Sequence, residues 1–268
     1  DISERAYHKT LKEMDIVARG ISPEKSWQRI LSECTIKAKD VNGLLNLYSK
    51  QIGNIKTFLK KKNILTIPEG QKIAVRKTPE FMVPVRASAS YSAPISVNPR
   101  ESGFFYLTPY LEQNAKTKKP EFSNIHLEYI FVTAHETFPG HHLLDYVRHH
   151  LKNTIRQQIE SPIFHEGWAS YSEQLIDRLG YIKDPVQRLV GFKRQAWRAI
   201  RAMLDVGMRI NKLTPEDAER KLRNLGYSPS IVKNMVRHYM LTCGYQLCYT
   251  IGKYEIEKLE KRFLSKLG

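Results

Sequence analysis

The sequence predicts a mainly α fold with a small β-sheet element, and three observations support this prediction. Apolar residues recur at helical spacing through most of the chain, and helix-starting residues precede them. Residues 67–109 differ, because prolines there separate short, β-prone pieces. The chain has 268 residues, of which 41% are hydrophobic, so it can bury a large core. We therefore expect one domain over residues 1–268, with a strand and loop subregion at 67–109.

The N-terminal part of the chain is expected to be largely helical. Ser22-Pro23 is typical of a helix start, with a capping serine before a proline at the first helical position. It predicts a long, charge-rich helical stretch toward Lys60, interrupted near Gly43 and Gly53. In the β-prone subregion that follows, strands are expected near residues 72–75 and 104–107.

A series of helices is expected after residue 122. Helical periodicity returns at Ser123-Asn124 and continues to His135. A second helix fits residues 164–179, and Gly180 is its stop signal. The later helix starts are, in order, Asp184-Pro185, Thr214 with Asp217 as a capping box ahead of Gly226, Ser228-Pro229, and a last helix from about Tyr245.

The net charge of +16 raises the question of nucleic-acid binding, since 43 Lys and Arg stand against 27 Asp and Glu. The basic residues are scattered, however, and form dense runs only at Lys60-Lys61-Lys62 and from Lys116 to Lys119. Solvated helix faces explain this scatter better than a binding groove does, so we expect no nucleic-acid partner.

No membrane span is expected, because no apolar run approaches the roughly 18 residues that a transmembrane helix needs. The N-terminus also lacks the apolar core of a signal peptide, which favours a cytoplasmic location. Export stays open as an alternative, because the chain begins at Asp1 without an initiator methionine.

The stretch from Ala134 to His142 carries the strongest chemical signal, and it reads A-H-E-T-F-P-G-H-H. Many zinc peptidases use a His-Glu pair and a second histidine within two helical turns to present two imidazoles and a general base to one metal. His135 is thus the first candidate zinc ligand. Glu136 is the candidate base that activates the attacking water.

The second ligand is either His141 or His142. Pro139, four residues after His135, has no N–H to donate to the His135 carbonyl, so a regular helix cannot continue unbroken. A bulge or local unwinding is expected at Pro139 and Gly140. On an undistorted helix His142 would share the face of His135, whereas a bulge can turn His141 inward. Helical geometry leaves both alternatives open.

The third ligand is expected on a following helix, which opens with the stretch from His165 to Glu173. Glu166 and Glu173 lie two turns apart on one face, so one could bind the metal while the other orients a histidine from behind. The plainer interpretation of Glu166 is an acid favoured by the helix dipole at a helix start. Beside a His-Glu pair on the preceding helix, the interpretation as a ligand is the stronger one.

These motifs resemble a large microbial family known as a domain of unknown function, which is marked by H-E-x-x-P-G-H-H and then E-G-W-A-x-Y-x-E. Further stretches similar to the family pattern are Ile64 to Pro68, Thr78 to Phe81, Gly103 to Tyr106, Asp205 to Met208, Thr214 to Ala218, and Gly244 through Tyr249 to Gly252. The family is grouped by its motifs with gluzincin-type metallopeptidases and is distantly similar to the HExxH carboxypeptidases of thermophiles. Its members are commonly much longer, so this chain resembles their C-terminal half.

The resemblance implies a gluzincin-like helical architecture, with zinc held by His135, His141 and Glu166. It favours His141 over His142, because the family pattern fixes Pro-Gly-His and lets the next position vary. It also implies Tyr249 as an active-site hydroxyl. The chain departs from the pattern at three positions: Arg209 stands where the family usually has His, Cys243 where it has Pro, and Tyr245 where it has Gln.

The expected function is zinc-dependent peptide hydrolysis of the carboxypeptidase or oligopeptidase type. Tyr249 or His238 could stabilise the oxyanion that develops on the scissile carbonyl. A strand edge at residues 103–108, with Phe105 and Tyr106, could receive an extended peptide substrate. Two alternatives stay open, namely a zinc hydrolase acting on a non-peptide amide and a basic binding protein whose metal site is a relic.

Overall fold

The structure is a computed structural model, and it describes residues 2–36, 38–83, 88–94, 102–113 and 120–267. The chain divides into two compact units. Unit 1 comprises residues 1–33, 160–171 and 182–268, and unit 2 comprises residues 34–159 and 172–181. The expected single domain stays a prediction. Parts of the predicted strand subregion (84–87 and 95–101) and the basic run from Lys116 to Lys119 lie outside the described residues.

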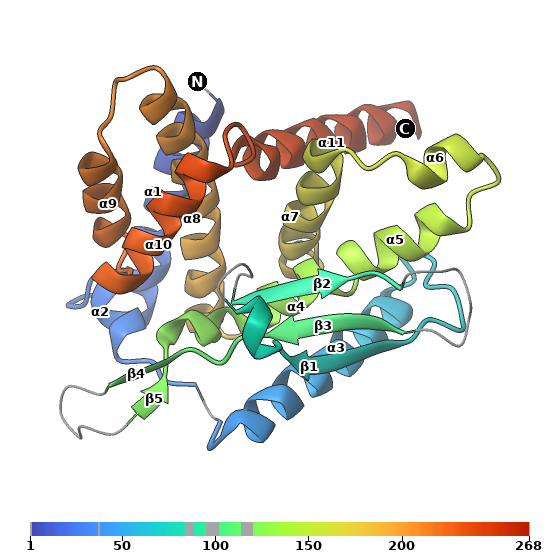
Figure 1. The fold of residues 1–268 in the computed structure, drawn as a ribbon, viewed down its shortest axis with the longest axis horizontal. Coiled ribbons are helices and arrows are strands. Elements are labelled where there is room, and N and C mark those ends of the chain that lie inside the picture. Colours follow the sequence, from blue (N-terminus) through green and yellow to red (C-terminus); the bar gives the residue numbers. More distant parts are fainter. Residues whose placement is uncertain (1, 37, 84–87, 95–101, 114–119, 268) are drawn as a thin grey trace. The chain divides into compact units, whose positions relative to one another are not determined.

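Unit 1 is built from helices. In this unit α1 (Ile2–Ile21) packs along α8 (Pro185–Arg209), as Figure 1 shows. The buried side of α8 includes the apolar residues Leu189, Ala196, Ile200 and Leu204. The other helices of unit 1 are α2 (Trp27–Ser32), α9 (Pro215–Asn224), α10 (Pro229–Leu241) and α11 (Leu247–Leu267).

One helix, α7 (Pro162–Arg178), runs without a break from residues of unit 1 into residues of unit 2. Its core-facing side includes Ala169, Tyr171 and Leu175. The chain leaves α7 through Gly180, whose φ of 82° is a left-handed conformation that glycine adopts without strain. The helix and its stop signal agree with the prediction.

Unit 2 contains a three-stranded sheet in the order β1 (Ile73–Lys77), β3 (Gly103–Leu107) and β2 (Ala89–Ser92). The central strand β3 is parallel to β1 and antiparallel to β2. Burial alternates along β3, so that Phe105 and Leu107 enter the core. On that side α3 (Val41–Lys62) packs on the sheet, as Figure 1 shows. The ring of Tyr48, on this helix, lies against that of Phe105. The predicted small β element is confirmed.

The remaining elements of unit 2 lie on both sides of these strands in the sequence. They are the 3-10 helices η1 (Glu80–Met82) and η2 (Asn124–Glu128), the antiparallel pair β4 (Leu111–Gln113) and β5 (Pro120–Phe122), and the helices α4 (Tyr129–Glu136), α5 (His141–His149) and α6 (Thr154–Gln158). Of these, α4 packs on α3 and near β2, which fixes the helix that carries the His-Glu pair. None of the helices formed by the described residues is both long enough and apolar enough to cross a bilayer.

Local capping by a side chain explains several of the helix starts. Asp184 caps α8 by accepting a hydrogen bond from the N–H of Val186, and Thr214 and Asp217 form the predicted capping box of α9. The helix α10 begins at Pro229, directly after Ser228, also as predicted.

The predicted helix start at Ser22-Pro23 is wrong. The preceding helix α1 runs to Ile21, so these two residues belong to the turn that follows it. The side chains of Ser26 and Asp40 cap the next helices, α2 and α3, instead. The predicted interruptions are also wrong, because α3 continues through both glycines: Gly43 lies in its first turn and Gly53 in its interior.

Candidate metal centre

The helical structure is interrupted between α4 and α5. The first helix ends at Glu136, and the second begins at His141. A Cβ atom at Gly140 would lie 1.9 Å from the carbonyl oxygen of His135, so only glycine fits where the chain turns. The distortion predicted at this point is therefore real, and it is a break between two helices rather than a bulge within one. As a result, His141 is the first residue of a new helix.

His135 and Glu173 form a buried pair. The Nδ1 atom of His135 lies 2.9 Å from Oε1 of Glu173, and both side chains are almost inaccessible to solvent. Because Nδ1 is held in this way, Nε2 is the ring nitrogen that can face a metal. The place of Glu173 thus fits a carboxylate that orients a ligand from behind.

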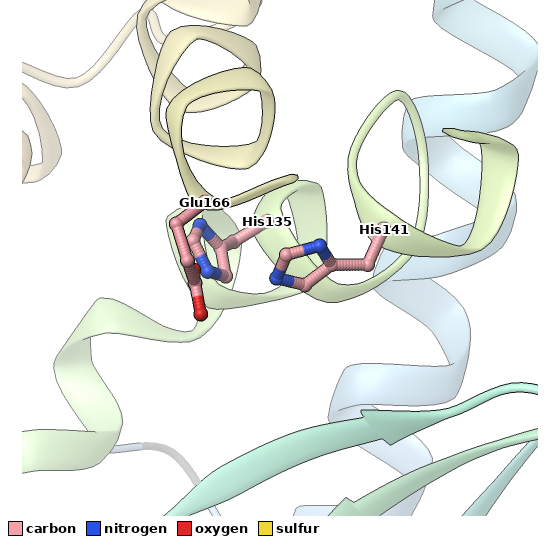
Figure 2. A group of neighbouring side chains, drawn as sticks. All are labelled: His135, His141 and Glu166. Carbon is pink, nitrogen blue, oxygen red and sulfur yellow. The ribbon is translucent and has the colours of Figure 1, made fainter. Parts of the chain in front are cut away.

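The side chains of His135, His141 and Glu166 bring their ligand atoms together, as Figure 2 shows. One atom from each residue lies within 4.8 Å of the other two, and all three residues are buried. The two imidazole rings meet edge to face, with centroids 4.7 Å apart. Glu166 extends from α7, two turns before Glu173. This buried group of two imidazoles and one carboxylate could hold a metal ion.

His142 is turned toward other partners. Its Nδ1 lies 3.4 Å from the hydroxyl of Tyr91, and its ring packs edge to face on Tyr91 and Phe138. Burial lowers the pKa of His142 to about 4, so the ring is neutral at pH 7. Of the two histidines that helical geometry left open, His141 is the one that joins the cluster.

Glu136, the last residue of α4, is half-buried and is held by the backbone of β2. Its Oε2 accepts a hydrogen bond of 2.8 Å from the N–H of Tyr91. The carboxylate is thus fixed in direction by β2 and follows His135 directly in the chain, yet Glu136 is not a member of the group that could hold a metal. A general base must not itself be coordinated to the metal, and the position of Glu136 outside this group is compatible with that requirement.

The strand β2 forms one edge of the three-stranded sheet within the described part of the chain. Ser88, directly before this strand, accepts a hydrogen bond of 2.9 Å from the N–H of Thr108, directly after β3. In an antiparallel pair, every second residue of a strand points its N–H and C=O toward the partner strand, so this bond shows which residues of β2 do so. Ala89 and Tyr91 are then the residues whose N–H and C=O groups point away from β3. This direction explains why the N–H of Tyr91 reaches Glu136. Among the described residues, no other strand pairs with this edge.

The predicted strand edge at residues 103–108 is wrong, because β3 is the central strand and is paired on both sides. The predicted contact of Phe105 with substrate is wrong as well, since its side chain is 0% exposed and packs on Tyr48. Tyr106 lies on the opposite face, partly exposed and stacked on Phe104 with centroids 5.7 Å apart. Its role with a substrate stays a prediction.

Within unit 1, α7 and α11 cross at a pair of glycines. A Cβ atom at Gly167 would lie 2.5 Å from the carbonyl carbon of Gly252. A Cβ atom at Gly252 would lie 2.0 Å from the carbonyl oxygen of Ile163. Only glycines let the two backbones approach so closely. The crossing brings the start of α11 to Glu166, the residue just before Gly167.

Two tyrosine hydroxyls at the start of α11 donate hydrogen bonds to Glu166. Both reach Oε1, from Tyr245 over 2.6 Å and from Tyr249 over 3.1 Å. Burial raises the pKa of both hydroxyls, and the charge of Glu166 adds to the rise, so both remain donors at pH 7. Because Oε1 already accepts two hydrogen bonds, Oε2 is the better oxygen for a metal ion.

Two buried arginines of α8 pack against the ring of Tyr249. The guanidinium of Arg201 lies 4.0 Å from the ring centroid, and that of Arg198 lies 4.8 Å from it. Arg201 also donates to the side chain of Gln246, and Arg198 donates to Ser170. Buried charges need such hydrogen bonds and aromatic faces to offset their lost hydration. Together these contacts hold Tyr249 in place.

Sequence reasoning missed Tyr91 and Tyr245. Tyr245 precedes Tyr249 by four residues, which is one helical turn, and this spacing was a usable signal. Tyr91 gave no such signal, because it contributes a backbone N–H.

His238, predicted to stabilise an oxyanion, is exposed on α10, where partial burial of the ring and the charge of Arg201 lower its pKa. Its role stays a prediction.

The fold is shared with solved bacterial proteins. One is described as "the putative lipoprotein from Colwellia psychrerythraea"; it is 24% identical with a TM-score of 0.81, and the match covers 100% of this chain and 46% of that one. Another, described as "a putative lipoprotein of unknown function from Shewanella oneidensis", is 20% identical with a TM-score of 0.79, over 99% of this chain and 51% of that one. The chain therefore spans about half the length of these two proteins, and at such identities the likeness concerns the fold alone.

No curated protein matches the sequence. The family comparison, in contrast, covers residues 1–268, which is the whole chain. The chain belongs to the family described as "Bacterial protein of unknown function (DUF885)".

Proposed function

We propose that this protein is a zinc-dependent peptidase of the carboxypeptidase or oligopeptidase type. The observation that carries the proposal is the buried group of His135, His141 and Glu166, whose ligand atoms all lie within 4.8 Å of one another. A structural role alone does not explain why two imidazoles and a carboxylate from three helices converge next to a fourth side chain, the carboxylate of Glu136, which is itself fixed by a hydrogen bond.

The chemistry of the donor set fits zinc. Catalytic zinc sites in proteins typically use three nitrogen and oxygen ligands and keep a fourth position open. The carboxylate of Glu173 behind His135 adds the carboxylate–histidine pairing that is common at such sites. When bound, zinc would polarise a substrate carbonyl and make an attacking water more acidic.

The residues of the chain have separate tasks in this proposal. Glu136 takes a proton from the attacking water and passes it to the amine that leaves. The N–H of Tyr91 keeps the Glu136 carboxylate aimed at the reacting atoms through their hydrogen bond of 2.8 Å. The hydroxyls of Tyr245 and Tyr249 hold Glu166 in the orientation that a ligand needs.

The edge of β2 that faces away from β3 supports a peptide as the substrate. An extended peptide can add to a sheet edge by backbone hydrogen bonds alone. Ala89 offers both its N–H and its C=O at this edge, and Tyr91 offers its C=O while its N–H is held by Glu136. A peptide bound there would run past the proposed base, which favours a peptide over a small non-peptide amide.

An exported location is part of the proposal. The two solved proteins of the same fold are described as putative lipoproteins, and this description favours export over the cytoplasmic location expected from the N-terminus.

The test combines metal analysis with kinetics. The protein, purified without chelator, should contain close to one zinc per chain and should cleave members of a peptide library. Glu136→Gln keeps the size of the side chain but removes its basicity. It should retain the zinc and lower turnover about 10²–10⁴-fold, the usual cost of a lost general base.

Glu216→Gln is the matched control, because Glu216 is exposed on α9, and it should leave both zinc content and turnover unchanged. A protein that binds no transition metal even when zinc is supplied contradicts the proposal. Equal turnover by wild type and Glu136→Gln contradicts the assigned base. Cleavage of non-peptide amides but of no peptide would favour the alternative hydrolase.

A further inference from the structure

Glu166 has one more hydroxyl donor than its orientation requires. Tyr245 and Tyr249 both donate to the same oxygen, Oε1, over 2.6 and 3.1 Å. A single charge-assisted hydrogen bond suffices to fix the direction of a carboxylate that also binds a metal. One of the two hydroxyls can therefore leave Glu166 during a reaction without releasing it.

Tyr249 is the hydroxyl that cannot leave. It lies within α11, one turn before Gly252, where the backbones of α7 and α11 are in contact. Its ring also lies against the guanidiniums of Arg201 and Arg198, at 4.0 and 4.8 Å from the centroid. Turning this ring away would strip an aromatic face from two buried charges, which is costly.

Tyr245 is held much less firmly. It lies in the turn at residues 242–246, between α10 and α11, and directly follows Gly244, whose φ is 76°. Its side chain is partly exposed, and its ring meets that of Tyr249 edge-on, with centroids 5.9 Å apart. A rotation of the Tyr245 side chain moves its hydroxyl while Tyr249 keeps its own hydrogen bond to Glu166.

We infer that Tyr245 is a catalytic residue that donates its hydroxyl hydrogen bond to the scissile carbonyl oxygen, while Tyr249 is the positioning residue of Glu166. This inference rests on the proposed peptide hydrolysis, and it replaces Tyr249 by Tyr245 as the expected oxyanion donor.

In the reaction, the water oxygen bonds to the carbonyl carbon, and the π electron pair of the carbonyl moves onto the carbonyl oxygen. Glu136 takes the proton of the water. As the C–N bond breaks, the oxygen returns its pair to carbon and the amine departs with the proton from Glu136.

The exchange at Tyr245 needs no proton transfer. Its hydroxyl breaks the hydrogen bond to Glu166 and makes one to the carbonyl oxygen as that oxygen becomes negative. A donor aimed at a developing oxyanion in a water-poor site typically contributes about 10²–10³-fold to the rate.

The test compares Tyr245→Phe with Tyr249→Phe, each of which removes one oxygen and keeps the ring. Both are assayed in saturating zinc with a peptide that wild type cleaves and with a phosphinic peptide inhibitor, whose tetrahedral anion resembles the transition state. We expect Tyr245→Phe to keep its zinc affinity and KM, to lose about 10²–10³-fold in kcat, and to bind the inhibitor more weakly by a similar factor.

Tyr249→Phe should show the opposite pattern. Its zinc affinity should fall about 10–100-fold, as for a lost partner of a metal ligand, while kcat in saturating zinc stays within about tenfold of wild type. Wild-type kcat in Tyr245→Phe, or a kcat loss confined to Tyr249→Phe, overturns the assignment and leaves the proposed function standing. A zinc-loaded wild type that cleaves no peptide overturns both.

Discussion

The histidine segment, residues 135–142, and the tyrosine cluster of Glu166, Tyr245 and Tyr249 are organised by different means. In the histidine segment the course of the backbone places the side chains, because α4 ends, Gly140 permits the break, and His141 starts α5. In the tyrosine cluster, residues far apart in the sequence meet where α7 and α11 cross. The local backbone conformation therefore determines the arrangement of the histidines, and packing between distant helices determines that of the tyrosines.

The two regions also differ in how they bury ionisable groups. In the histidine segment the ring of His142 is buried as a neutral group, because burial lowers its pKa to about 4. His126 of η2, which lies outside the segment, is buried in the same way, with a pKa of about 4. The tyrosine cluster lies against the buried guanidiniums of Arg198 and Arg201, which stay charged at any ordinary pH. Acid should therefore weaken the surroundings of the histidines before it affects the packing around the arginines.

The largest expected effect is a loss of zinc binding, and it tests whether the break between α4 and α5 makes His141 rather than His142 the ligand. His141→Ala should abolish zinc retention, with a loss of affinity above the roughly 100-fold upper range for partners that only orient a ligand. His142→Ala removes the neighbouring imidazole, which packs on Tyr91 instead, and should leave most of the zinc bound. Zinc content after dialysis and titration with a competing chelator measure both. The reverse order of losses would mean that α4 continues past Glu136 in solution.

The second prediction tests the glycine crossing that supports the tyrosine cluster. In Gly252→Ala the new Cβ would lie 2.0 Å from the carbonyl oxygen of Ile163, so one helix must move. We expect a loss of more than about 3 kcal/mol in the free energy of unfolding, above the usual range for overpacking. Urea denaturation provides the measurement.

Gly53→Ala is its control, since Gly53 lies inside α3 with nothing within 4 Å of a new Cβ. That change should stabilise the protein by about 0.5–1 kcal/mol, because alanine loses less backbone entropy on folding. If the two substitutions have similar effects, the close approach of α7 and α11 does not hold in solution.

The same contrast explains how much of the molecule could be predicted from its sequence. Helices with chemical start signals were predicted well, because a cap such as Asp184 or Thr214 bonds to residues two or three positions away. A bulge or local unwinding near Gly140 was predicted on similarly local grounds, because Pro139 has no N–H for the His135 carbonyl, and the structure has a break there. Which of His141 and His142 turns inward could not be derived from helical geometry, since the backbone angles of the break decide it.

Non-local arrangements were the ones that failed. The edge role given to residues 103–108 was wrong, because strand order depends on pairing between segments rather than on any one segment. Tyr91 was missed because only the position of β2 at the sheet edge turns its N–H to Glu136. Ser22-Pro23 failed for a different reason: several polar residues follow α1, and Ser26, not Ser22, bonds to the next helix.

The smallest of the expected effects is a change in the pH dependence of the free energy of unfolding, and it tests whether histidines are buried as neutral groups. His126, in η2, is 1% exposed, with its ring against Tyr48 and Phe122. Burial lowers its pKa from 6.5 to about 4, so the unfolded chain binds a proton more readily than the folded one between these values. Its contribution to stability is complete above pH 6.5 and is lost as the pH falls toward 4. The total loss is about 3 kcal/mol.

The measurement is the free energy of unfolding between pH 7.5 and 4.5, with a chelator present so that metal binding does not contribute. In His126→Gln the lost packing lowers stability at every pH, but the titrating group is gone, so the decline with acid should be shallower than in wild type by roughly 2–3 kcal/mol over this interval. His8→Gln, at an exposed position on α1, should decline in parallel with wild type. Parallel curves for wild type and His126→Gln would mean that the His126 ring is hydrated in the folded protein. The contrast between neutral buried imidazoles and charged buried guanidiniums would then rest on His142 alone.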